Sequence, residues 1–339
     1  MRIVLCYPVE GRHVAQIHRT LEESGVEADV IDAGQERIAE ELLEADIYCG
    51  HAKVPVPWDQ VVQQGRLKWI QSSAAGMDHC LTPEVVASDI MVSSASGVLA
   101  DQVADHTLAL TLGWLRSLPT FFRAQQKREF IRRPTRDLHG ARVGIVGFGG
   151  NGRRLAEVLR PFRVEISATD YFPDDRPPHV KRLLAADRLD EMLSECDILI
   201  LAAPLNDQTR GMIDAGRLAL LPEGALLVNM ARGPLVVEAD LVEAIRSGRL
   251  GGAAVDVTDP EPLPEESPLW EMPEVIITPH VGGQASGRID GMTSFFCANL
   301  KRFLQGEVPL NFTDKTLGFP HPEHAAWRNM QIDHSKSSR

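Results

Sequence analysis

The stretch Val143–Gly152, VGIVGFGGNG, decides the fold of this chain. It opens with apolar residues typical of a buried β-strand and closes with Gly147, Gly149 and Gly152 in GxGxxG spacing. The first glycine permits a sharp turn, the second lets backbone approach a pyrophosphate, and the third lets the next helix, expected over 153–159, pack on the sheet. Because the glycines lie between a predicted strand and a predicted helix, they predict a dinucleotide site at the helix N-terminus.

A carboxylate supports this interpretation. Asp170 ends the next expected strand, about 20 residues beyond the glycines, where an acidic side chain meets the adenosine ribose hydroxyls. A carboxylate there would repel a 2′-phosphate, so the sequence favours NAD over NADP. The alternative is that Asp170 simply caps its strand.

Composition excludes several classes of protein. The chain has 339 residues, a length that suits two domains, and a net charge of −12 with no block dense in Lys or Arg. Nucleic acid and anionic membrane surfaces are therefore not expected partners. No apolar run approaches the roughly 20 residues that span a bilayer. The N-terminus, MRIVLCYPVEGR, is typical of a first strand and not of a signal peptide.

Nothing in the sequence indicates a metal site. The five cysteines lie far apart with no CxxC pair, which favours reduced thiols and a cytoplasmic protein. His51, His79 and His106 lack the spacing of metal ligands. The serines of 93–96 lie in no GxSxG elbow, so a hydrolase has no support.

Two series of strands and helices follow one another along the chain. The first has strands expected at 2–7, 29–32, 46–49, 68–72 and 90–93 and helices at 14–24 and 36–44. A long helix is expected from about 100 to 118, after which Pro119 and Pro134 break the pattern around a basic segment. The second series has six strands, expected at 142–146, 164–169, 198–202, 225–228, 253–257 and 275–277. The fold class is therefore α/β, with two doubly wound parallel sheets.

The second series interrupts the first. We expect a flavodoxin-like substrate domain made of 1–100 and 288–339, with a Rossmann NAD-binding domain, 101–287, inserted into it. The helix expected over 289–305 then rejoins the first domain. The tail from about Leu317 is rich in Pro, His, Lys and Ser, and is predicted to be mobile.

Three polar residues follow the carboxyl ends of later strands, where ligands bind in such sheets. Arg232 follows ALLVNMA, Glu261 follows AAVDVTDP, and His280 follows VIITP. Arginine grips a carboxylate or polarises a carbonyl oxygen, histidine exchanges a proton near neutral pH, and a carboxylate beside histidine stabilises the imidazolium. Together they suit hydride transfer between nicotinamide and a 2-keto acid, although each alone could be an ordinary surface or loop residue.

The chain resembles the D-isomer-specific 2-hydroxyacid dehydrogenase family. The segments that carry the resemblance are AAGMDH (74–79), VADHTLAL (103–110), VGIVGFGGNGRRLA (143–156), NMARGPLVVEADLVEAI (229–245), AAVDVTDPEPLPEESPLW (253–270) and TPHVGG (278–283). The family's catalytic arginine, glutamate and histidine fall on Arg232, Glu261 and His280. LKWIQSSAAGMDH (67–79) resembles the glyoxylate and hydroxypyruvate reductases more than the phosphoglycerate enzymes.

The resemblance implies further roles. Backbone amides of Ala75 and Gly76 would bind the substrate carboxylate. Apart from the resemblance, Lys53 in GHAKV could reach a distal anionic group or could equally face solvent. Asp256 would hold the nicotinamide amide, and the loop from Pro204 to Thr209 would pass the adenine ribose. The other cofactor positions implied are Gly150, Asn151, Met230, Ala231, Gly282 and Gly283. The family also implies a homodimer formed by the cofactor domains and the helix near 100–118.

Some residues depart from the family pattern. Gly150 and Asn151 stand where the family often has Arg-Ile, Met230 replaces a small or polar residue, and Asp105 stands where Glu is usual. Two other activities stay open. Relatives of this fold act as NAD-sensing corepressors that bind peptides, and phosphite oxidation uses the same three catalytic residues.

Overall fold

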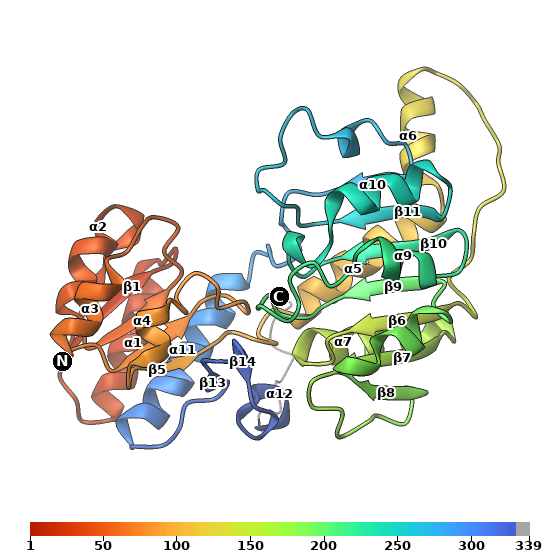
Figure 1. Ribbon diagram of the computed structural model, residues 1–339. Helices are drawn as coiled ribbons and strands as arrows, with labels where there is room; N and C mark the ends of the chain where they lie inside the picture. The colour runs from red at the N-terminus through yellow and green to blue at the C-terminus, as the bar shows by residue number, and fades with distance from the viewer. Residues whose placement is uncertain (330–339) are drawn as a thin grey trace. The chain divides into compact units, whose positions relative to one another are not determined.

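The computed structural model describes residues 1–329, and its contacts divide the chain into two compact units (Figure 1). Unit 1 holds Met1–Leu99 and the chain from Ala285 onward, and unit 2 is the continuous segment Ala100–Gln284. The chain therefore leaves unit 1, builds unit 2, and returns. Within residues 1–329, no helix has the length and apolar character that crossing a membrane requires.

Unit 1 is built on a five-stranded sheet in which every pairing is parallel. Its spatial order is β2-β1-β3-β4-β5, the flavodoxin-like order, which confirms the predicted class. The strands are β1 (Arg2–Cys6), β2 (Asp29–Asp32), β3 (Ile47–Gly50), β4 (Trp69–Ser72) and β5 (Met91–Ser93).

Helices cover both faces of this sheet. The core on one face joins β1, β3 and β4 to α1 (Gly11–Glu23) and α11 (Arg288–Leu304), which lie side by side in Figure 1. The core on the other face takes in α2 (Gly34–Glu41), α3 (Trp58–Gln64) and α4 (Pro83–Ala87). Trp69 stacks on Phe296 of α11 with ring centroids 5.6 Å apart. A helix that follows unit 2 in the sequence thus completes the core of unit 1.

Unit 2 is built on seven parallel strands in the order β12-β11-β10-β9-β6-β7-β8, a Rossmann arrangement. The strands are β6 (Arg142–Val146), β7 (Glu165–Asp170), β8 (Arg182–Ala185), β9 (Ile198–Leu201), β10 (Ala225–Asn229), β11 (Leu250–Val255) and β12 (Val275–Ile277). The sequence predicted six of these seven strands and missed β8. That edge strand buries only Leu184 fully, so it lacks the continuous apolar run of its neighbours.

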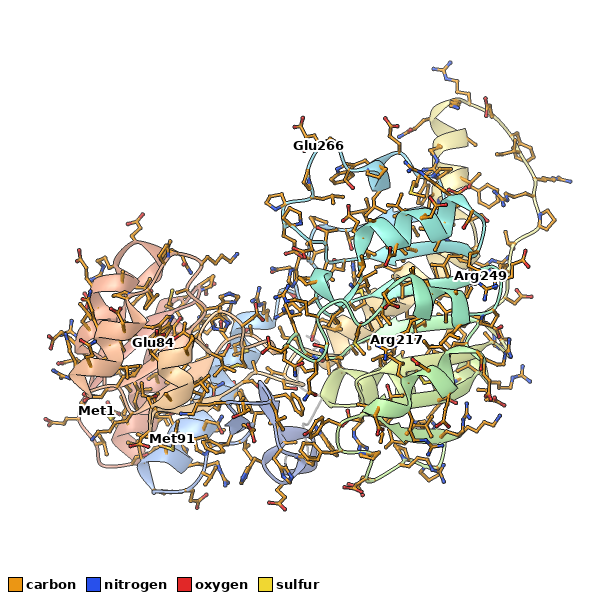
Figure 2. All side chains as sticks on the ribbon, in the orientation of Figure 1. Met1, Glu84, Met91, Arg217, Arg249 and Glu266 are labelled. Atoms are coloured by element: carbon orange, nitrogen blue, oxygen red, sulfur yellow. The ribbon has the colours of Figure 1, made fainter. Side chains whose placement is uncertain are left out.

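Two layers of helices enclose this sheet as well. One face packs on α5 (Ala100–Leu115) and α7 (Gly150–Leu159), and the other on α8 (Leu189–Leu193), α9 (Ala215–Leu220) and α10 (Glu238–Arg246). Arg249, labelled in Figure 2, lies just before β11 and donates to the Ala219 carbonyl oxygen of α9 at 2.5 Å. Polar as well as apolar contacts therefore join α9 to the segment that leads into β11.

The long helix is shorter than predicted. α5 ends at Leu115, and α6 (Leu118–Gln126) begins after Ser117, whose φ is +56°. Pro119 was expected to break the helical pattern, but it lies in the first turn of α6, where its missing N–H costs no hydrogen bond.

The chain after Leu317 was predicted to be mobile, and this is wrong as far as residue 329. It forms β14 (Phe319–Pro320), which pairs with β13 (Thr313–Asp314), and then α12 (Ala326–Asn329). The buried Asn311 side chain fixes this segment, because it accepts from the Ala326 amide at 2.7 Å and donates to the Ser96 carbonyl oxygen at 2.8 Å. The rest of the predicted mobile tail, 330–339, lies outside the described residues.

Short 3₁₀ turns complete the architecture. They are η1 (Leu42–Glu44), η2 (Arg160–Phe162), η3 (Ala186–Arg188), η4 (Gly233–Leu235), η5 (Pro268–Trp270) and η6 (Pro322–His324).

Candidate active site

The glycine loop lies at the point where the strand order of unit 2 reverses. β6 pairs with β7 on one side and with β9 on the other, which makes this the ligand-binding edge of a doubly wound sheet. Gly147 has φ +92°, and a Cβ added there would lie 2.6 Å from the Ala203 nitrogen. A Cβ on Gly152 would lie 2.2 Å from the Gly147 carbonyl oxygen, whereas one on Gly149 would meet nothing within 4 Å. The first and third glycines therefore serve packing, and the second leaves open space.

That open space adjoins the N-terminus of α7. Gly149 is the N-cap and supplies no side chain to the helix, and Gly150, Asn151 and Gly152 form the first turn. Amides in a first helical turn have no partner within the helix and carry the positive end of its dipole. The backbone amides of these residues therefore fit a dinucleotide pyrophosphate.

Asp170, at the end of β7, is tied to the glycine loop. Its Oδ2 accepts from the Phe148 amide at 2.6 Å and its Oδ1 from the Phe172 amide at 2.9 Å. Burial raises the pKa of Asp170 above its ordinary value, and the two amides oppose that rise. The side chain does cap its strand, as the alternative interpretation held. The same contacts also hold a carboxylate beside the predicted dinucleotide loop.

Hydrogen bonds within the loop 204–209, which follows β9, hold it in a compact turn. The Thr209 hydroxyl donates to the Pro204 carbonyl oxygen at 2.7 Å and accepts from the Asn206 amide at 2.9 Å. Pro204 and Thr209, both predicted cofactor residues, therefore belong to one ordered turn.

The loops after β10 and β11 touch through a glycine. A Cβ on Gly233 would lie 1.9 Å from the Thr258 carbonyl oxygen, so only glycine allows this approach. Arg232, just before it, donates from Nη1 to the Ala231 carbonyl oxygen at 2.8 Å, while the Asn229 side chain accepts from the Ala231 amide at 3.1 Å. Arg232 is thereby carried beside the loop that bears Glu261.

Glu261 and His280 meet directly. Oε2 of Glu261 lies 2.9 Å from Nδ1 of His280, and both side chains are close to half exposed. The other carboxylate oxygen accepts from the Thr258 amide at 3.2 Å. A carboxylate on Nδ1 fixes the ring orientation and directs Nε2 to the other side, the arrangement of a proton-transfer histidine.

The loop that carries His280 is held by Asp256, the first residue after β11. The buried carboxylate accepts from the Thr278 hydroxyl at 2.6 Å and from the amides of Val281 and Gly282 at 2.9 and 2.8 Å. The backbone carbonyl of Asp256 accepts from the His280 amide at 2.7 Å. His280 itself has φ +54°, a left-handed conformation that costs energy outside glycine and that these bonds sustain.

Sequence reasoning missed three members of this cluster. Asn229 and Thr278 lie beside motif residues that were noticed, so their positions were available signals. His106 was predicted not to be a metal ligand and was noted otherwise only within VADHTLAL (103–110). It lies on α5 with Nε2 3.0 Å from the Thr278 hydroxyl oxygen. No local pattern in the sequence links His106 to a residue 172 positions away.

The predicted substrate residues belong to unit 1. Ala75, exposed, and Gly76 lie in the turn after β4, which Ser72 supports by accepting from the Ala74 amide at 3.0 Å. Lys53 is exposed in the segment after β3, and its amide donates to the Gln35 side chain at 2.7 Å. These residues thus stand at the carboxyl edge of the sheet of unit 1, whereas the catalytic set belongs to unit 2.

The cysteine, histidine and carboxylate side chains of residues 1–329 meet the requirements of neither a reactive thiol nor a metal site. All five cysteines are free and buried, and burial raises the pKa of Cys6 to about 11 and of Cys196 to about 12, so they stay protonated thiols near neutral pH. Among residues 1–329, no group of three or more His, Cys, Asp or Glu side chains is arranged to hold a metal ion.

Comparison with known proteins agrees with this geometry. Residues 108–282 match the NAD-binding domain of the D-isomer-specific 2-hydroxyacid dehydrogenases. A glyoxylate reductase of Thermococcus kodakarensis is 33% identical over 74% of this chain and 77% of its own length. A solved D-isomer-specific 2-hydroxyacid dehydrogenase from Xanthobacter autotrophicus, in complex with NADPH, aligns with TM-score 0.78 and 28% identity over 94% of this chain and 99% of its own. An NADPH-dependent glyoxylate/hydroxypyruvate reductase from Sinorhizobium meliloti aligns with TM-score 0.77 and 26% identity over 94% and 99%.

Replacing single glycines of the loop should show which of them is required for backbone packing. Gly152→Ala places a methyl group against the Gly147 carbonyl oxygen and should lower the free energy of unfolding by about 2–3 kcal/mol. Gly149→Ala meets open space and should leave it within about 0.5 kcal/mol. Urea unfolding of the two variants beside the parent measures both values. Equal stability of the two variants would contradict the packing role of Gly152.

Proposed function

The chain belongs to the D-isomer-specific 2-hydroxyacid dehydrogenase family, and from that membership we propose that it reduces a small 2-keto acid to the D-2-hydroxy acid with NADH. The observation that carries the proposal is the 2.9 Å contact between Glu261 and His280. The His280 imidazole, held by the Glu261 carboxylate, follows β12 at the carboxyl edge of the sheet whose strand β6 leads into the glycine loop. Membership itself makes the protein an oxidoreductase.

Each catalytic residue has a role in this proposal. When bound, the nicotinamide supplies or accepts the hydride at the substrate carbon. His280 gives a proton from Nε2 to the carbonyl oxygen during reduction, and takes it back from the hydroxyl in the reverse direction. Glu261 holds the imidazole by Nδ1 and stabilises its charged form. Arg232 pairs with the substrate carboxylate or polarises the reacting carbonyl oxygen.

The remaining predicted residues bind rather than react. Amides of Ala75 and Gly76 receive the substrate carboxylate, because a turn of small residues lets the backbone approach it. Lys53 attracts a distal anionic group of the substrate.

Cofactor contacts come from the ligand-binding edge of unit 2. The residues proposed to form them are Gly147, Gly149, Gly150, Asn151, Gly152, Asp170, Pro204, Thr209, Met230, Ala231, Arg232, Asp256, His280, Gly282 and Gly283.

The substrate class proposed is glyoxylate, hydroxypyruvate and similar short keto acids. Two observations support it. The relatives from Thermococcus kodakarensis and Sinorhizobium meliloti carry the names of glyoxylate or glyoxylate/hydroxypyruvate reductases. The segment LKWIQSSAAGMDH (67–79) also resembles glyoxylate and hydroxypyruvate reductases more than phosphoglycerate enzymes.

NAD is the cofactor proposed, although two solved relatives hold NADPH or NADP. Support comes from Asp170, whose carboxylate is fixed next to the glycine loop by the Phe148 amide. A negative charge there disfavours the 2′-phosphate of NADP. The buried free thiols support a reducing compartment, and we propose the cytoplasm.

A panel of keto acids tests the reaction. We expect NADH oxidation with glyoxylate or hydroxypyruvate, and slower turnover with pyruvate and phenylpyruvate. His280→Gln should lower kcat by a factor of about 10²–10⁴ while NADH affinity changes less than about threefold, since proton transfer is lost and phosphate binding is kept. His18→Gln, the same change at an exposed histidine on α1, is the control.

Two outcomes would count against this assignment. One is full turnover in the His280→Gln variant. The other is an absence of NADH oxidation with every keto acid, combined with NAD⁺ reduction by phosphite, which would favour the phosphite alternative.

Removing the carboxylate charge at the proposed ribose site tests the choice of cofactor. Asp170→Asn removes the negative charge and keeps one acceptor, so the affinity for NADP⁺ should rise about tenfold and that for NAD⁺ should fall. Asp187→Asn, at an exposed position of η3, should change neither. Isothermal titration calorimetry measures the four affinities, and unchanged NADP⁺ binding in Asp170→Asn would contradict the role of this carboxylate.

We propose that the protein is a homodimer formed by unit 2. α6 and the segment after it expose large apolar side chains, with Phe122 58% and Phe130 90% exposed. A second copy of the chain would cover them; the family resemblance implies a dimer formed by the cofactor domains and the helix near 100–118. Phe122→Asp together with Phe130→Asp should convert the dimer to a monomer in sedimentation velocity, while Trp270→Asp, at another exposed aromatic position, should not. A monomeric parent protein would refute this arrangement.

A further inference from the structure

A second histidine lies behind the loop that carries His280. Nε2 of His106, on α5, lies 3.0 Å from the Thr278 hydroxyl oxygen and 3.3 Å from Oδ1 of Asp256. The Thr278 hydroxyl gives its own hydrogen to Asp256 at 2.6 Å, so its oxygen accepts from His106. His106 therefore carries hydrogen on Nε2 in this geometry, and it is one proton away from an imidazolium next to a carboxylate.

This imidazole shares its surroundings with residues proposed to bind the nicotinamide end of the cofactor. A Cβ built on Gly282 would lie 2.7 Å from Cε of Met230, 3.0 Å from Oδ2 of Asp256 and 3.5 Å from Cδ2 of His106. The three side chains thus converge on one glycine. His106 has no role in the proton transfer proposed for His280 and Glu261.

The ion contact of His106 is with Asp256. Asp256, 3% exposed, faces it from the end of β11, and His280 lies in the same loop as Thr278. Met230, at the end of β10, carries no charge. The packed helix α7 contributes Arg154, which is paired with Asp101 of α5 and with Glu157. On α5 itself, Asp105 is exposed to solvent. Protonation of His106 thus changes the summed charge of the His106 and Asp256 side chains from −1 to zero.

We propose that His106 is a proton-linked positioning residue that sets the preference of the site for oxidised or reduced cofactor. The inference rests on the proposed function, which brings a nicotinamide ring to Asp256. The oxidised ring carries a positive charge and the reduced ring does not. With His106 neutral, the Asp256 carboxylate favours the oxidised form, and with His106 protonated that advantage disappears. Acidic conditions therefore favour binding of the reduced cofactor and the direction of keto-acid reduction.

The ratio of two affinities isolates this effect. NAD⁺ and NADH share the same phosphates, ribose and adenine, so any pH effect on those contacts cancels in the ratio of their dissociation constants. We expect the dissociation constant of NAD⁺ divided by that of NADH to rise about tenfold in the parent protein as the pH falls from 8 to 6. This is the range where histidine side chains take up a proton.

His106→Gln keeps an N–H donor for Thr278 but cannot be protonated, so its ratio should stay within about twofold over the same range. His280→Gln is the matched comparison and should retain most of the pH dependence. A ratio in His106→Gln that follows the parent, or one abolished only in His280→Gln, would overturn the proposal. Calorimetry with the dinucleotides alone gives all these values without any keto acid.

A pH-dependent ratio in a protein that turns over no keto acid would refute only the proposed function, whereas an absence of dinucleotide binding would refute both.

Discussion

The buried carboxylate of Asp256 is the constraint on which the candidate active site depends. Parallel pairing of β11 with β12 aligns Val255 with Ile277, so the residues after each strand, Asp256 and Thr278, emerge together. Asp256 then binds the Thr278 hydroxyl and two amides of the following loop, and a buried charge needs such donors to remain in the interior. The strained backbone of His280 persists because these bonds define its loop on both sides.

The candidate active site also requires two pairs of backbone segments to lie very close together, and a glycine permits this in each pair. Gly233 lets the loop after β10 rest on the Thr258 carbonyl oxygen, which brings the chain of Arg232 beside the chain of Glu261. Gly152 does the same for α7 and the end of β6. Both contacts involve rigid backbone, so a methyl group cannot be accommodated by a side-chain rotation. The polar residues of the site are therefore positioned by the sheet rather than by each other alone.

Most of unit 2 was predictable from sequence because its central strands are continuous apolar runs followed by recognisable loops. The glycine spacing also located the edge at which the strand order of the sheet reverses, and the Glu261–His280 contact followed from strand ends that parallel pairing brings together. β8 escaped because an edge strand buries little and carries a weak pattern. His106 escaped because its partners, Thr278 and Asp256, are joined to it only by tertiary packing of α5. Order in the chain after Leu317 depends on one buried asparagine, Asn311, which composition does not reveal.

The division of unit 1 into two sequence segments has a consequence for synthesis on the ribosome. Unit 2 is one continuous stretch, and every strand and helix of its sheet leaves the ribosome before α11 does. The sheet of unit 1 is made first, but Trp69 stays without its Phe296 neighbour, and Gln71 without its 2.8 Å bond from Asn299, until the last part of the chain arrives. The later-made unit is thus able to fold first, while the nascent first unit waits with an uncovered apolar face, the kind of surface that chaperones hold.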